Sequence, residues 1–134
     1  MSLIEFKRIL RFAAVGLSAA AIHYVSVVIL VETLATPPLL ANIAGFFISF
    51  WMSYFGHRFW TFGDHANMNN SSFLRFFATA SLGFGMNELL FYLMLAHTAI
   101  PYTIALALAV FTVAMSTYFL SRLWAFRSQT AQHS

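Results

Sequence analysis

Two arginines stand at matching places in two similar segments, and the guanidinium group is well suited to holding a phosphate. Arg58 precedes an aromatic run at the end of one apolar stretch, and Arg122 does the same at the end of another. A guanidinium donates parallel hydrogen bonds to two phosphate oxygens, so two such groups could form a fork around one phosphate. An anchoring role fits the pattern equally, with the arginine reaching lipid headgroups and the rings lying in the membrane interface. The residues concerned are Arg58, Arg122, Trp60 and Trp124, with Arg11 and Arg75 as secondary phosphate candidates.

Glu88 is a second kind of candidate because it lies inside an apolar stretch. Counted from Phe76 at 1.5 Å per residue, it lies about 18 Å along its helix, near the middle of a membrane. A carboxyl group at that depth costs several kcal/mol unless it is protonated or paired. Glu88 could couple transport to protons, accept a hydrogen bond from a sugar hydroxyl, or pair with His23 in helix packing. Its neighbour Asn87 is a further polar candidate at the same depth.

Asn42 lies near the start of the second apolar stretch, within a row of small residues. The row contains Ala41, Gly45, Ser49 and Ser53, each four residues after the last. Small residues at this spacing let two helices approach closely, so we expect the row to pack against a neighbouring helix. A polar path for a substrate is the alternative role, and Asn42 is the member that suits it, as His23 does in the first stretch.

The overall composition shows what kind of fold must position these groups. Only 8% of the 134 residues are charged, 60% are hydrophobic, and the mean hydropathy is +0.77. So few charged side chains cannot coat a globule of this length in water. The balance therefore excludes a soluble enzyme, a disordered tail and a nucleic-acid-binding domain.

Four apolar stretches have the roughly 20 residues that a helix needs to cross a bilayer. They cover residues 12–34, 39–59, 73–96 and 102–124. Prolines at 37, 38 and 101 break the chain within two pairs of stretches, which predicts short turns there. We expect an all-α integral membrane protein in which residues 1–134 form one membrane domain. Two helical hairpins would be joined by a polar loop at 63–72.

The basic residues predict the direction of these spans. Positive charge concentrates on the cytoplasmic side of membrane proteins, and the turns near Pro37 and Pro101 have none. Both termini and the 63–72 loop are therefore expected in the cytoplasm, in a multi-pass protein of the cell inner (cytoplasmic) membrane. The seven residues that set this bias are Lys7, Arg8, Arg11, Arg58, Arg75, Arg122 and Arg127.

The two hairpins also resemble each other in sequence. Arginine, tryptophan and proline are scarce here, so their coincidence at one offset indicates a duplication. Repeat one covers about residues 11–62 and repeat two about residues 75–126. Because each unit crosses twice, the copies would have the same orientation, as parallel repeats do. An offset of 64 aligns Arg11 with Arg75, His23 with Asn87, Pro37 with Pro101, Arg58 with Arg122 and Trp60 with Trp124.

Several kinds of site have no support in the sequence. Cysteine is absent, and the five histidines lack the spacing of metal ligands. There is no nucleophile and base pair and no glycine-rich phosphate loop. We therefore expect no metal, no cofactor, no nucleic-acid partner and no enzymatic activity.

Taken together, these features resemble the GtrA-like family of small four-span membrane proteins. The likeness covers about residues 8 to 127. Where the family often has asparagine before the arginine of the first closing segment, this chain has His57. The segments that carry the resemblance are Arg11-Phe12, Val15-Gly16, Leu40-Ala41-Asn42, Arg58 to Phe62, Arg75-Phe76 and Ser121 to Phe126.

The resemblance implies a role in cell-surface polysaccharide synthesis or modification. Family members are proposed to move a polyprenyl-phosphate-linked monosaccharide from the cytoplasmic to the outer leaflet. The lipid phosphate would then be held by Arg58 and Arg122. A polar passage for the sugar would come from Asn42, His23, Asn87 and Glu88. The expected partners are this sugar lipid and the membrane lipids, together with glycosyltransferases and a second copy of the chain.

Two other functions remain as alternatives. One is a proton-coupled exporter of small molecules that uses Glu88, resembling the small multidrug transporters. Two features count against it: Glu88 lies in the third stretch rather than the first, and the charge bias fixes one orientation in the membrane. The other is a non-transporting membrane partner that positions a glycosyltransferase.

Overall fold

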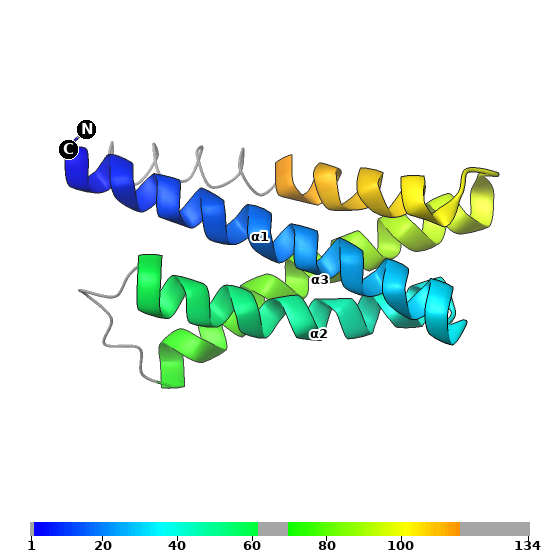
Figure 1. Ribbon diagram of the computed structural model, residues 1–134, viewed down its shortest axis with the longest axis horizontal. Helices are drawn as coiled ribbons and strands as arrows, with labels where there is room; N and C mark the ends of the chain where they lie inside the picture. The colour runs from blue at the N-terminus through cyan, green and yellow to red at the C-terminus, as the bar shows by residue number, and fades with distance from the viewer. Residues whose placement is uncertain (1, 62–69, 116–134) are drawn as a thin grey trace, which may run out of the picture. The chain divides into compact units, whose positions relative to one another are not determined.

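The computed structural model describes residues 2–61 and 70–115, and every regular element in these ranges is a helix. The predicted sites at Arg122 and Trp124, and the central loop up to residue 69, lie outside the described residues. In chain order the elements are α1 (Leu3–Leu34), α2 (Pro38–Gly56), the π-helix η1 (His57–Thr61), α3 (Asn70–His97) and a helix over Tyr102–Met115 (Figure 1).

α1 has clear start and stop signals. Ser2 accepts a hydrogen bond from the Glu5 backbone N–H at 3.2 Å, and the Ser2 backbone N–H donates to Glu5 Oε2 at 3.0 Å. This reciprocal pair is a capping box, which satisfies N–H groups that a helix start leaves open. The helix ends where Ala35 adopts a left-handed conformation, with φ 53°, just before the two prolines. The residues before Arg11 are continuous with the helix of the first span, which was predicted to begin at residue 12.

α2 begins with proline in its first turn, where the missing N–H has no helical partner to lose. It ends differently from α1, because the last turn widens into η1. At the junction the His57 backbone N–H donates to the carbonyls of both Ser53 and Tyr54. Single π-turns inside or at the end of α-helices are uncommon and occur frequently at functional sites. The sequence predicted an ordinary helix through these residues.

α1 and α2 form the first hairpin, lying side by side and antiparallel (Figure 1). The predicted row of small residues faces this contact, since Ala41, Gly45 and Ser49 are buried. At Gly45 an added Cβ would lie 2.8 Å from Val27 Cγ2 and 3.2 Å from the His23 carbonyl oxygen. Only glycine permits that approach, so the row packs α2 against α1.

Within residues 2–61 and 70–115, two helices are long and apolar enough to cross a membrane, Leu3–Leu34 and Pro38–Thr61. α3 has 28 residues, which is a sufficient length, but Asn87 and Glu88 lie in its second half and lower its apolarity. The helix over Tyr102–Met115 is apolar and is described only as far as Met115. The count of four spans therefore stays a prediction for the second hairpin.

The chain divides into two compact units, Met1–Phe84 and Gly85–Ser134. Among the described residues of the second unit, the buried ones are Asn87, Phe91, Ala105, Leu106 and Ala109. Subtracting 64 from each gives His23, Val27, Ala41, Asn42 and Gly45, which are all buried in the first unit. The helix starts at Pro38 and Tyr102 are also 64 residues apart. This agreement supports the duplication, while the orientation of the repeats across a bilayer stays a prediction.

Candidate functional site

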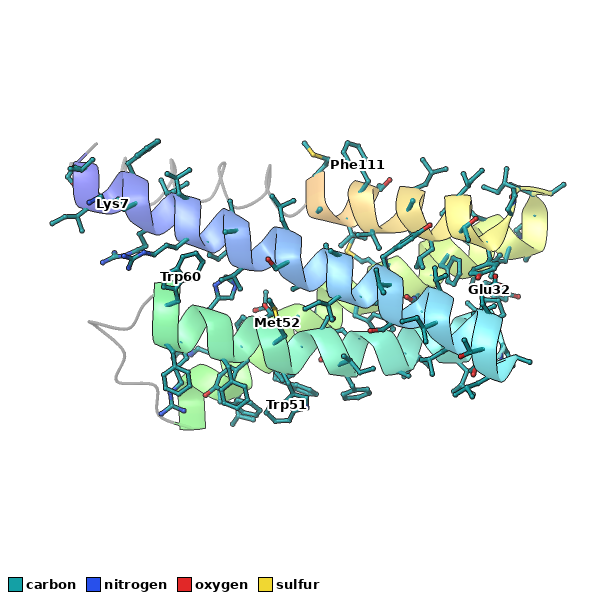
Figure 2. The ribbon with its side chains drawn as sticks, viewed as in Figure 1. Lys7, Glu32, Trp51, Met52, Trp60 and Phe111 are labelled. Carbon is teal, nitrogen blue, oxygen red and sulfur yellow. The ribbon has the colours of Figure 1, made fainter. Side chains whose placement is uncertain are left out.

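Arg11 and Trp60 connect the two helices at the open end of the hairpin. Arg11 Nη1 donates to the Trp60 carbonyl oxygen at 3.3 Å, and its Cζ lies 5.9 Å from the centre of the Trp60 ring. Figure 2 shows Lys7 and Trp60 at this same end and Glu32 at the opposite end. The arginine that the sequence ranked as secondary is thus the one that joins α1 to η1.

His57 lies on the same π-turn as Trp60 and packs against Phe12 of α1. Its ring stacks on Phe12 with centroids 4.7 Å apart, and its Nδ1 lies 3.1 Å from Thr61 Oγ1. Both His57 and Thr61 are buried, in an end of the helix where the sequence predicted interface residues. The π-turn carries His57, Trp60 and Thr61 together, so its wider geometry shapes the whole end of the hairpin.

Arg58 is half-buried on the same π-turn and contacts different groups. Its Nη1 lies 3.5 Å from the Tyr54 hydroxyl, and its Cζ lies 5.4 Å from the centre of the Phe59 ring. Among the described residues, Arg11 and Arg58 contact only a carbonyl, a hydroxyl and aromatic rings. The recorded partners of both guanidinium groups in the described ranges are therefore neutral, and a guanidinium among neutral groups can donate to an anion.

A buried polar pair lies deeper in the hairpin. His23 Nε2 and Asn42 Oδ1 are 2.6 Å apart, and because an amide oxygen only accepts, the histidine nitrogen donates. His23 is 8% exposed and Asn42 is fully buried. His23 follows Arg11 by twelve residues, or about 18 Å along α1, which is the predicted mid-depth position. The Phe84 ring lies 6.4 Å from the His23 ring.

The structure brings some predicted residues together and leaves others apart. It unites His23 with Asn42, and Arg11 with Trp60. Arg75 is exposed near the start of α3. Asn87 is buried and Glu88 half-buried in the second unit, and their grouping with the first-unit residues stays a prediction. Within the described ranges, no group of three or more metal-binding side chains is assembled.

Sequence reasoning missed the residues that support these contacts, chiefly Phe12, Tyr54 and Thr61. For Phe12 and Tyr54, the signal in the sequence was the abundance of aromatic residues, with 16 phenylalanines in the chain. Nothing in the residue pattern indicated the π-turn, because its wider hydrogen bonding depends on tertiary contacts at the helix end.

The fold and these two sites define an integral membrane protein with two arginines among neutral groups at one end of an apolar hairpin and a polar pair within it. A family model described as GtrA/DPMS, transmembrane domain, matches residues 11–126, and the chain belongs to this family. The match begins and ends where the two predicted repeats do. Neither the comparison with curated proteins nor that with solved structures gave a match.

Proposed function

We propose that this protein moves a polyprenyl-phosphate-linked monosaccharide from the cytoplasmic to the outer leaflet, for cell-surface polysaccharide synthesis or modification. Membership of the GtrA/DPMS transmembrane family supports this class of role. The observation that carries it is that one hairpin holds two arginines among neutral groups at its end and a polar pair about 18 Å further along α1.

The cationic end suits the lipid phosphate. Among the described residues, Arg11 and Arg58 contact neutral groups, so a phosphate would meet positive charge there. The surrounding rings of Trp60 and Phe59 are 50% and 69% exposed, which places apolar surface beside the charges. An amphiphile with an anionic head and an apolar chain needs this combination.

The polar pair suits the sugar. A hydroxyl group that leaves water for a lipid interior loses its hydrogen bonds, and the cost falls if the protein offers replacements. His23 and Asn42 can each donate and accept, but they are bonded to each other and buried. The proposal therefore requires α1 and α2 to separate locally so that the sugar exchanges for the partner side chain.

The experiment is uptake of a radiolabelled, short-chain polyprenyl-phosphate hexose into sealed liposomes that contain the purified protein. We expect uptake above that of empty liposomes, falling about tenfold in Arg11→Ala/Arg58→Ala, since one charge-assisted hydrogen bond is worth about 1.5–3 kcal/mol. Lys7→Ala removes a charge at the same end and is the matched control, with uptake unchanged. Uptake equal to that of empty liposomes would exclude the proposal.

The same liposomes separate the two other functions. Imposing and then collapsing a pH gradient changes uptake only if Glu88 couples transport to protons, as an exporter requires. A protein that moves no lipid but co-purifies with a glycosyltransferase would be the non-transporting partner instead.

A further inference from the structure

Five aromatic rings form a continuous stacked row along α2, η1 and the first half of α3. In order along the row they are Phe59, Phe55, Trp51, Phe73 and Phe77. Successive centroids are 6.0, 6.0, 6.1 and 6.3 Å apart, and successive planes differ by 8°, 26°, 25° and 16°. Figure 2 shows Trp51 on the side of α2 that is turned away from α1. At Trp51, the row therefore faces away from α1.

The rings are accessible as well as aligned. Trp51 is 48% exposed, Phe55 46% and Phe77 37%, while Phe73 is half-buried. Residues that merely anchor a helix in the membrane interface need no common ring orientation. Near-parallel rings over two helices instead form a regular aromatic series, so a molecule lying along them meets one ring after another.

One end of the row carries positive charge. Arg58 Cζ lies 5.4 Å from the centre of the Phe59 ring, and the same guanidinium contacts the Tyr54 hydroxyl. Within the part of the chain that the structure describes, no arginine is recorded over any of the other four rings. The surface is therefore complementary to a molecule with an anionic group at one end and a long apolar chain.

We propose that this aromatic row binds the isoprenoid chain of a phosphate-bearing lipid whose phosphate is held by Arg58. The inference rests on the proposed function and adds where the lipid chain lies. Each isoprene unit contains a planar double bond, whose π electrons can meet the positive edge of an aromatic ring. A saturated acyl chain has no planar groups, so the row discriminates between lipids by chain chemistry as well as by charge.

The test is native mass spectrometry of the purified protein with equal amounts of a polyprenyl phosphate and its fully hydrogenated counterpart. We expect the wild type to bind the unsaturated lipid about fivefold more, given the usual gain per stacked ring. The variant Trp51→Leu/Phe55→Leu/Phe59→Leu keeps an apolar surface but lacks the flat faces. It should bind both lipids equally, with its helix content by circular dichroism unchanged.

Phe111→Leu is the matched control, because Phe111 is a 64% exposed aromatic residue outside the row. It should retain the fivefold preference. The inference is overturned if the wild type shows no preference, or if the triple variant keeps it. It is also overturned if the variant changes only from dimer to monomer, since the row would then be an interface between copies. In each of these cases we expect lipid uptake into liposomes to persist, so the proposed function would stand. If the wild type bound neither lipid, the proposed function itself would be contradicted.

Discussion

His23 and Asn42 join α1 to α2 through a hydrogen bond of 2.6 Å inside an otherwise apolar contact. Their neighbours in this contact are Val27 and Gly45, which approach closely enough to exclude any larger side chain at position 45. A polar group in such surroundings is costly without its partner and inexpensive with it. The pair therefore specifies how α1 and α2 align, in addition to any role toward a substrate.

Asn42→Leu should destabilise the hairpin, because it removes the oxygen that accepts from His23 Nε2. We expect a loss of about 1–3 kcal/mol in the free energy of unfolding, the usual cost of leaving a buried polar group unsatisfied. The measurement is reversible unfolding of the purified protein in mixed micelles, followed by circular dichroism.

The double variant His23→Leu/Asn42→Leu provides the control. Replacing both partners by apolar groups removes the donor and the acceptor of this bond together, so the double variant should be more stable than Asn42→Leu alone. Position 106, the equivalent of 42 in the second repeat, already holds a fully buried leucine. Additive losses in the double variant would contradict the pairing.

The helices were predictable from the sequence because their signals are local. Apolar length placed the end of α1 and both ends of α2 within a few residues of their observed bounds, but α1 begins at Leu3, nine residues before the predicted start at residue 12. Prolines marked the starts at Pro38 and Tyr102. The row of small residues indicated the packed face of α2. The helix that packs against this face could not be named, because the sequence does not show which helix lies opposite Gly45. His23 and Asn42 were both identified, but their contact was not, since periodicity gives no distance between helices.

The end of the hairpin was the least predictable region. Arg11, Phe12 and His57 come from segments some 46 residues apart, and only the fold shows that they meet. The closing segment was expected to be an ordinary helix end with Arg58 as the chief cation. The π-turn changes this, because it directs the Trp60 carbonyl to Arg11 and places Arg58 beside Tyr54 and Phe59.

Gly45→Ala should separate α1 from α2, because the new Cβ would lie 2.8 Å from Val27 Cγ2 and 3.2 Å from a backbone oxygen. Such overpacking typically costs about 1–3 kcal/mol. Gly16→Ala is the matched control in the same hairpin, since a Cβ there meets nothing within 4 Å. It should be neutral or stabilise the helix by up to about 1 kcal/mol. Equal effects of the two substitutions on unfolding would refute the close contact.

Thr61→Val should weaken the π-turn while conserving side-chain shape. The substitution removes the hydroxyl that lies 3.1 Å from His57 Nδ1 and leaves a buried imidazole nitrogen without that contact. A loss of about 1 kcal/mol is expected in the free energy of unfolding. Thr79→Val is a suitable control, because Thr79 is exposed and its hydroxyl bonds only to the backbone one turn earlier. If both variants unfold alike, the His57 contact contributes no stability.

Arg11→Ala should open the end of the hairpin, because Arg11 holds η1 through both the Trp60 carbonyl and the Trp60 ring. The two contacts are worth about 1 kcal/mol together at an exposed site, so amide hydrogen exchange in residues 57–61 should quicken about fivefold. Arg11→Lys keeps the charge and part of the ring contact, and should give an intermediate rate. Lys7→Ala removes a charge from the same end of α1 without touching Trp60, so its exchange should match the wild type. Faster exchange in Lys7→Ala as well would mean that net charge, and not the Arg11 contact, holds the π-turn in place.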